Sequence, residues 1–396
     1  MWRHVAANAL TFAVVALFLL GGLVAWGVRQ WSAPGPLAEA ICLNVPGGGT
    51  MRAVSEDLAG RGAIARPEIF RIGADYAEKS ALLKEGSYRI PEGASMAEIV
   101  DIVTRGGAST CGTEVVYRIG VARTLAEVRE LDPATDAYRQ VAAFDPSAEA
   151  APPAYAEVRA RPDTTYRVVV AEGATSWQVV QGLNALDVLE GDVAAVPPEG
   201  SLAPSSYAVS PGDGVGALLA RMAADQERIL AEAWTGRAEG LPLSTPEEAL
   251  TLASIVEKET GVPEERALVA SVFVNRLREG MRLQTDPSVI YGITEGQGVL
   301  GRGLRQSELE AENPWNTYVI DGLPPTPIAN PGRAAIEAAL NPADTDFLYF
   351  VADGTGGHAF AATLAEHNRN VARWREIEAQ QAAAGAASGD APAATP

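Results

Sequence analysis

Apolar and polar residues recur with different periods along the chain, and each period predicts a different kind of element. Residues 8–28 carry no charge, and a helix of that length spans a hydrocarbon core of about 30 Å. Residues 87–103, 166–183 and 206–222 alternate apolar and polar positions, pass a glycine-containing turn and then place apolar residues at helical spacing. Residues 41–64 follow the same order less regularly. The patterns predict an α+β fold in which a transmembrane helix precedes several strand–turn–helix units.

The alternative interpretation of residues 8–28 is a cleaved signal peptide. The apolar core of a signal peptide is usually about 7–15 residues long and is followed by a small-residue cleavage site. The run here is longer and no clear site follows it, while Trp26 and Trp31 stand near its end, where aromatic residues favour the membrane interface. We therefore expect an uncleaved anchor.

Another helix is predicted in the second half of the chain, and both of its ends can be read from the sequence. Thr245, Pro246 and Glu248 supply an N-cap, a proline for the first helical position and a capping-box glutamate. Gly261 and Pro263 end the helix just after residue 260.

Glu259 lies near the C-terminal end of this helix and on its apolar stripe, because Leu252, Ile255, Val256 and Glu259 follow i, i+3, i+4, i+7 spacing. Burial and the negative end of the helix dipole both disfavour the charged carboxylate. The pKa of Glu259 should therefore be raised, as a catalytic acid working near neutral pH requires. The alternative is a rim carboxylate in a salt bridge. Glu257, two residues earlier, points elsewhere.

The composition excludes some functions. The chain has 31 basic and 50 acidic residues, a formal net charge of −19, which argues against nucleic acid as a partner because phosphate binding needs clustered Lys and Arg. Three scattered histidines (His4, His358 and His367) and two cysteines do not form a ligand cluster. We expect neither a bound metal nor a cofactor, and we expect His367 to be an ordinary surface residue.

The two cysteines of the chain are Cys42 and Cys111. Outside the membrane, thiols meet an oxidising compartment, so we expect these two residues to form a disulfide. A pair of unpaired buried cysteines is the alternative.

Two further segments are interpreted from their composition and pattern. Residues 380–396 contain no aromatic or branched aliphatic side chain and indicate a disordered tail. In residues 113–164, the stretch 116–131 resembles a further strand–turn–helix unit, and the Ala-, Pro- and Asp-rich remainder is typical of a loop or linker.

From about residue 251 to residue 374 the chain resembles the C-terminal domain of the YceG-like family, also called the MltG family, of membrane-anchored endolytic murein transglycosylases. The resemblance rests on ASIVEKET (253–260), VASVFVNRLREGMRLQTDPSVIYG (269–292), NTYVIDGLPPTPIANPG (316–332), FLYFVADGTGGHAF (347–360) and ATLAEHNRNV (362–371). The family's catalytic acid is the glutamate before the hydroxyl residue of the EKET run, which is Glu259 here. Trp315 and Thr326 depart from the tyrosine and the glycine that the family pattern has at these positions.

The resemblance implies a division of the chain into domains. Residues 1–7 form a short cytoplasmic N-terminus, residues 8–28 the transmembrane helix, residues 38–112 a LysM-like αβ subdomain, residues 113–164 an insertion or linker, residues 165–240 an intermediate αβ region, residues 241–379 a mixed α+β catalytic domain and residues 380–396 the tail. LysM modules bind glycans that contain N-acetylglucosamine, although ordinary αβ packing units would give the same pattern.

The resemblance also implies the chemistry. A lytic transglycosylase cleaves the β-1,4 bond between N-acetylmuramic acid and N-acetylglucosamine with one acid, and leaves 1,6-anhydro ends, here ending the elongation of nascent strands. Amide, hydroxyl and carboxyl side chains in the following loops suit sugar recognition. The expected substrate-binding residues are Gln284, Asp286, Tyr291, Asn316, Thr317, Tyr318 and Glu366, whereas Asn275 and Arg276 are expected to be structural.

Two other functions remain open at this stage. A hydrolytic muramidase would need a second carboxylate, for which Asp286 or Glu366 is the candidate. A non-catalytic LysM-type cell-wall binding or scaffold protein would have a decayed site, against which the intact EKET run speaks. The resemblance implies a single-pass protein of the inner membrane with most of its chain in the periplasm, with peptidoglycan strands as substrate and peptidoglycan synthases as partners.

Overall fold

The computed structural model describes residues 2–105, 111–161 and 164–388, and the chain in it forms two compact units. The first unit consists of Met1–Val115, Glu127–Ala143 and Ala151–Tyr166, and the second of Val116–Ala126, Phe144–Ala150 and Arg167–Pro396. The mixture of helices and strands confirms the predicted α+β class.

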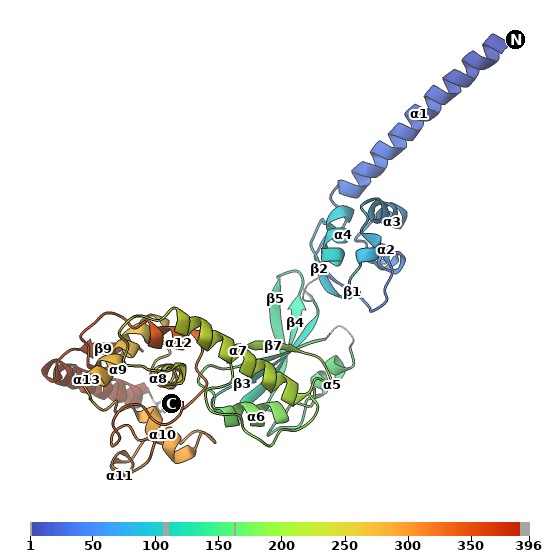
Figure 1. The fold of residues 1–396 in the computed structure, drawn as a ribbon. Coiled ribbons are helices and arrows are strands. Elements are labelled where there is room, and N and C mark those ends of the chain that lie inside the picture. Colours follow the sequence, from blue (N-terminus) through green and yellow to red (C-terminus); the bar gives the residue numbers. More distant parts are fainter. Residues whose placement is uncertain (1, 106–110, 162–163, 389–396) are drawn as a thin grey trace. The chain divides into compact units, whose positions relative to one another are not determined.

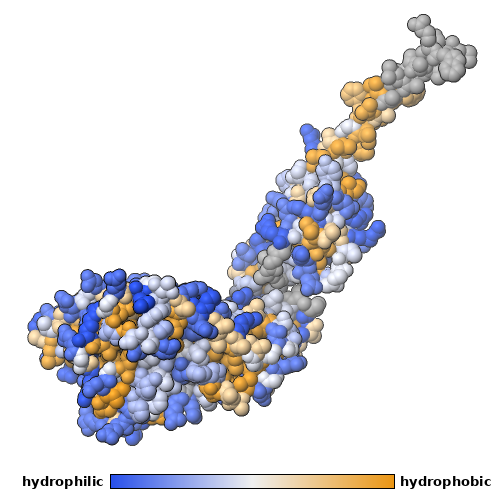
Figure 2. All heavy atoms as spheres, in the orientation of Figure 1, coloured by the Kyte–Doolittle hydropathy of each residue, from blue (hydrophilic) through white to orange (hydrophobic). Residues whose placement is uncertain are grey.

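Helix α1 (Trp2–Ser32) contains the predicted anchor. Its stretch Val14–Ser32 is long and apolar enough to cross a membrane, and none of that stretch is buried in the structure. Figure 2 shows hydrophobic side chains along the described part of α1, which projects from the first unit in Figure 1. An exposed apolar helix of this length is compatible with a single-pass membrane anchor.

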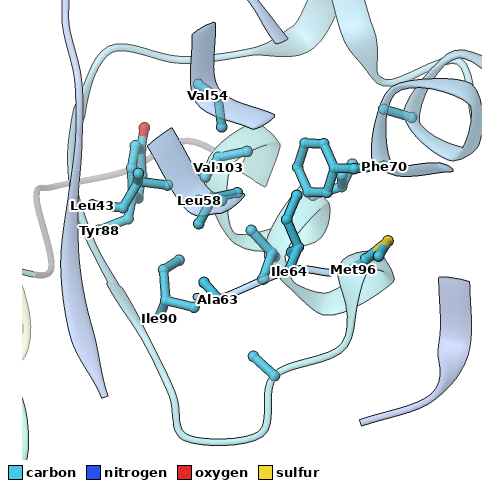
Figure 3. Close-up of a cluster of buried hydrophobic side chains, with 14 of the residues drawn as sticks. Leu43, Val54, Leu58, Ala63, Ile64, Phe70, Tyr88, Ile90, Met96 and Val103 are labelled. Atoms are coloured by element: carbon cyan, nitrogen blue, oxygen red, sulfur yellow. The ribbon is translucent and has the colours of Figure 1, made fainter. Parts of the chain in front are cut away.

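In the first unit, two paired strands are separated in sequence by two helices. Its elements are β1 (Ile41–Val45), α2 (Met51–Gly60), α3 (Pro67–Tyr76), η1 (Ser80–Leu82), β2 (Gly86–Ile90) and α4 (Met96–Arg105). Strands β1 and β2 are antiparallel, with Leu43 opposite Tyr88. Leu43, Leu58, Phe70 and other fully buried side chains fill the core that Figure 3 shows. Two of the predicted strand–turn–helix units, β1–α2 and β2–α4, are therefore present.

Cys42 and Cys111 form the predicted disulfide in the first unit. Their Cα atoms are 5.5 Å apart, which is within the usual range for a disulfide. The bond ties strand β1 to the residues that lead into β3.

A five-stranded sheet follows, and the stretch after residue 131 that was expected to be a loop or linker contains a strand and a helix. Its strands are β3 (Thr113–Ile119), β4 (Thr124–Asp132), β5 (Ala137–Phe144), β6 (Thr165–Val170) and β7 (Ser206–Val209), in the spatial order β5-β4-β3-β6-β7. Helix α5 (Pro153–Arg159) precedes β6. The stretch expected to be a helix is strand β4, because burial there alternates from Thr124 through Val128 with a period of two.

Apart from its part of the five-stranded sheet, the second unit is mainly helical. Its remaining elements are α6 (Ser176–Asn184), α7 (Val215–Thr235), α8 (Pro246–Glu259), η2 (Pro263–Glu265), α9 (Arg266–Arg278), α10 (Asp286–Thr294), α11 (Gln306–Leu309), α12 (Arg333–Leu340), β8 (Tyr349–Ala352), β9 (His358–Ala361) and α13 (Leu364–Ser388). The predicted units β6–α6 and β7–α7 are both present. Helix α8 packs against α7, α9 and α12, as Figure 1 shows, and lies at the centre of this core.

The predicted tail begins later than expected. Residues 380–388 continue helix α13, because the alanines of this stretch are strong helix formers even without a core to pack against. Residues 389–396 lie outside the described part of the chain.

Candidate active site

Helix α8 positions the candidate acid, and its ends match the prediction closely. The Thr245 side chain accepts a hydrogen bond from the Glu248 amide, and Pro246 occupies the first turn. The Glu248 carboxylate reaches the Ser244 amide, one residue before the N-cap that a standard capping box uses. The helix ends at Glu259, and Thr260 turns to an extended conformation.

The apolar stripe of α8 is buried as predicted. Leu252, Ile255 and Val256 have no exposed surface and belong to the second unit's core. Glu259, one turn later on the same face, is partly buried. The sequence therefore brings one carboxyl group to the edge of an apolar core.

Thr285 holds the Glu259 carboxyl group directly, since its hydroxyl donates a hydrogen bond to Glu259 Oε1. Thr285 is itself fixed by Thr317, whose hydroxyl oxygen accepts from the Thr285 amide at 2.9 Å. The Ser288 hydroxyl donates to the Thr285 carbonyl at 2.8 Å and contacts the Thr317 hydroxyl at 2.9 Å. This buried network sets the position of the Glu259 carboxyl group.

Burial raises the pKa of Glu259 to about 7, and nearby groups modify this effect. The Thr285 hydrogen bond lowers the pKa, the negative charge of Asp286 raises it, and His358 and Arg276 lower it. A carboxyl group with this pKa is about half protonated near neutral pH, which is the state that a general acid requires. The predicted direction of the shift is confirmed.

His358 was not selected from the sequence, yet the structure places it close enough to Glu259 to affect the pKa of that residue. Glu265 fixes His358 twice, with one carboxylate oxygen 2.7 Å from Nδ1 and the other accepting from the His358 amide at 2.8 Å. The contact is long-range, because strand β9 carries His358 and η2 carries Glu265. No local sequence signal pairs these two residues.

Arg276 is structural, as predicted, and also faces the site. Its Nε donates to the Leu348 carbonyl at 2.7 Å and its Nη1 to the Leu283 carbonyl at 2.8 Å. Its guanidinium lies over the Tyr349 ring at 5.3 Å. Asn275 likewise binds two carbonyls before β8. These bonds tie α9 to the segments that border Glu259.

Asp286 and Tyr318, two of the residues expected to bind substrate, form a polar pair close enough to Glu259 for electrostatic interaction. The Tyr318 hydroxyl donates to Asp286 Oδ1 at 2.6 Å. Burial and Asp286 together raise the pKa of Tyr318, so the phenol stays protonated and remains a donor. Gln284 is exposed next to Thr285, with a φ of 52° in the left-handed region, and its amide donates to the Thr317 carbonyl at 3.1 Å.

The structure corrects the expectation that Asn316 and Thr317 contact sugar, because both are fully buried. The Asn316 amide donates to three main-chain carbonyls between residues 308 and 311, and its oxygen accepts from the Tyr318 amide. Asn316 thus shapes the loop, and Thr317 positions Thr285.

Tyr291 and Glu366, two more of the residues expected to bind substrate, form hydrogen bonds within the protein. The Tyr291 hydroxyl donates to Glu199 Oε2 at 3.2 Å, and its ring packs against Trp315 at 5.6 Å. Glu366 lies at the N-terminal end of α13, where its amide binds the Thr363 hydroxyl. The His367 ring stacks on Tyr349 and is half-buried.

Glu257 points away from Glu259, as the helical spacing predicts. Its carboxylate accepts a hydrogen bond from the Gly332 amide at 2.9 Å. Burial raises the pKa of Glu257, the hydrogen bond from Gly332 lowers it, the charge of Glu172 raises it and that of Arg266 lowers it. The two glutamates therefore occupy different environments on one helix.

The described residues contain no group of three or more His, Cys, Asp and Glu side chains that could hold a metal ion. One surface hollow of about 440 Å³ is lined by residues 237–241 and Leu243. Another of about 560 Å³ is lined by residues in or next to η2, α7, α9 and α12, and Glu259 lines neither. The site is instead defined by Glu259 and the polar side chains around it.

Comparison with known proteins gives one family. The model of the YceG-like family matches residues 43–373. A protein of Bacillus subtilis named endolytic murein transglycosylase is 45% identical over 120 residues, which is 30% of this chain and 32% of that protein. One of Streptococcus pneumoniae with the same name is 29% identical over 84% of this chain and 58% of its own length. The chain thus spans about a third of the length of the first relative and somewhat over half of the length of the second.

A crystal structure of a yceG-like protein from Listeria monocytogenes aligns over 84% of this chain and 98% of its own chain, with 25% identity and a TM-score of 0.45.

Proposed function

This chain belongs to the YceG-like family, and we propose that it is a lytic transglycosylase of peptidoglycan in which Glu259 is the catalytic acid. The observation that carries the proposal is the environment of Glu259. A partly buried carboxyl group with a pKa of about 7 ends helix α8 and is fixed by the Thr285 hydroxyl. The relatives named endolytic murein transglycosylase support the substrate class.

The proposed reaction uses Glu259 twice. Its protonated carboxyl group donates to the glycosidic oxygen between N-acetylmuramic acid and N-acetylglucosamine, and the bond from that oxygen to C1 of the muramic acid breaks. The resulting carboxylate then accepts the proton of the C6 hydroxyl, whose oxygen bonds to C1 and closes a 1,6-anhydro ring. The glutamic acid is regenerated and no water is consumed. A pKa near neutrality serves both steps, since neither protonation state is strongly disfavoured.

The polar side chains beside Glu259 have supporting roles in this proposal. Gln284 and the Asp286–Tyr318 pair would bind acetamido and hydroxyl groups of the strand, because they offer amide, carboxylate and phenol groups near the acid. Thr285 and Thr317 are positioning residues, since they hold the acid and do not need to touch sugar.

A hydrolytic muramidase is a second candidate because Asp286 is close enough to raise the pKa of Glu259. In that reaction a second carboxylate acts as base or nucleophile. Asp286, which accepts the hydrogen bond from Tyr318, is the candidate for that carboxylate.

The products decide between them. A transglycosylase leaves muramyl ends that are lighter by one water than hydrolysed ends and that resist borohydride reduction, because the anhydro ring has no free aldehyde. We expect such ends as the main product when purified glycan strands are digested and analysed by mass spectrometry. Reducible ends as the main product would show a muramidase and would direct attention to Asp286.

The wider setting is also part of the proposal. Helix α1 would anchor the chain in the inner membrane with both units in the periplasm, where the disulfide forms. The order β1–α2–α3–β2 with paired outer strands supports a LysM-like subdomain that binds the same glycan. Cleavage of nascent strands beside peptidoglycan synthases would end their elongation.

A further inference from the structure

The first unit carries a group of exposed hydrophobic side chains that its core does not explain. Ile72 is 68% exposed, Tyr76 is 92% exposed and Leu82 is 49% exposed. They are the large hydrophobic side chains that are exposed among the described residues from 33 to 115. All three lie on α3 or on η1, which packs against α3. Exposed hydrophobic side chains gathered in one short segment indicate a binding surface rather than chance exposure.

Helix α3 is attached to the end of the candidate anchor. The Trp31 ring lies 6.4 Å from the Phe70 ring, and a Cβ atom added at Gly73 would overlap Trp31. Glycine at this position therefore allows the last turn of α1 to lie directly on α3. Three residues after α1 ends, the Gly35 amide donates to the Gly93 carbonyl at 3.0 Å. The unit is thus joined to α1 by packing and hydrogen bonds without a long linker.

The exposed side chains border this attachment. At about 100° per residue around a helix, Ile72 and Tyr76 lie on the same side of Gly73, at about 100° and 60° from it. The exposed face of α3 therefore adjoins the surface that Trp31 covers. Trp31 belongs to the apolar stretch Val14–Ser32, so the exposed face adjoins the level at which α1 would leave the hydrocarbon core.

We propose that the face formed by Ile72, Tyr76 and Leu82 rests in the headgroup region of the lipid bilayer that α1 crosses. Tyrosine and tryptophan favour this region because each combines an apolar ring with a polar group, and a helix face with apolar side chains can lie in the interface plane. The surface holds the first unit against the membrane. The inference rests on α1 as the membrane anchor and is independent of the reaction at Glu259.

Site-directed spin labelling of the full chain in lipid nanodiscs tests this inference. The disulfide uses both cysteines of the chain, so a single added thiol can be labelled selectively. The labelled variants are Ile72→Cys and Tyr76→Cys on the proposed surface and Ala53→Cys as the control. Ala53 lies on another helix of the first unit, α2, and is exposed. Leu20→Cys, at a 59% exposed position of α1, reports on the anchor itself.

The measured quantity is the accessibility of each label to oxygen, which concentrates in lipid, and to a water-soluble nickel chelate. We expect labels at 72 and 76 to be several-fold less accessible to nickel than the label at 53, with an oxygen accessibility between that of 53 and that of 20. Nickel accessibility at 76 equal to that at 53, with a lipid signal at 20, would overturn the inference. Protection of 72 and 76 from both reagents would indicate a protein on this face and would also overturn it.

An aqueous signal at position 20 would overturn the anchor and this inference together. None of these readouts depends on glycan cleavage, so they stand apart from the product analysis that tests the proposed reaction.

Discussion

Replacing Glu259 with Gln is expected to lower activity on glycan strands by at least about 10²-fold, the low end for the loss of a general acid. Glutamine keeps the volume of the side chain and can still accept the hydrogen bond from Thr285, but it has no proton to transfer. The fold should persist, because the substitution removes a partly buried ionisable group and adds no bulk. Turnover of purified strands measures the loss, and circular dichroism and glycan pull-down show whether fold and binding remain.

Glu257→Gln is the matched control for this variant. Glu257 lies two residues away on α8, has a raised pKa for the same reason and binds the Gly332 amide instead of the site. We expect Glu257→Gln to retain most of the activity. If Glu257→Gln were inactive and Glu259→Gln active, the assignment of the acid to this face of the helix would be wrong.

Removing the disulfide is expected to destabilise the first unit by about 4 kcal/mol in the chain-entropy model. The size of the effect follows from the separation of 69 residues between Cys42 and Cys111, because a longer closed loop restricts the unfolded chain more. Urea unfolding of a Cys42→Ser/Cys111→Ser variant, beside the oxidised parent, measures the difference. Both proteins should be compared in the same detergent.

The disulfide also has a direct chemical test. Mature protein that is alkylated without reduction should take up no label at either cysteine. Labelling of both thiols would show that the bond is absent in the protein as it is made.

Local signals predicted the elements that carry the site, because the residues that stop and start α8 are neighbours in sequence. The N-cap at Thr245, the apolar stripe through Val256 and the end at Glu259 needed no tertiary information. The same holds for the strand–turn–helix units, where a period of two changes to a helical period within a few residues. Strand β4 was missed because its charged residues also fit a helix, and pairing with β3 and β5 decides such a segment.

The groups around Glu259 were harder to predict because they come from distant segments. Thr285 and His358 approach Glu259 only after α9 and the β8–β9 hairpin have packed. A polar side chain near a motif can also support the backbone instead of the substrate, and sequence does not separate these roles. Asn316 shows this, since its side chain forms hydrogen bonds to main-chain groups of its own loop.

The most direct test of Glu259 as a proton donor is a titration of its carboxyl group. In protein labelled with ¹³C at the glutamate carboxyl carbon, the Glu259 signal is identified by its loss in Glu259→Gln. The burial-raised pKa of about 7 predicts a protonated carboxyl group at pH 5 and an ionised one at pH 9. Activity should fall as the pH rises through the same pKa, because the acid form that donates the proton is lost. A midpoint near the ordinary glutamate value of about 4.3 would contradict the proposed role, since the group would then be ionised at the pH where it must donate.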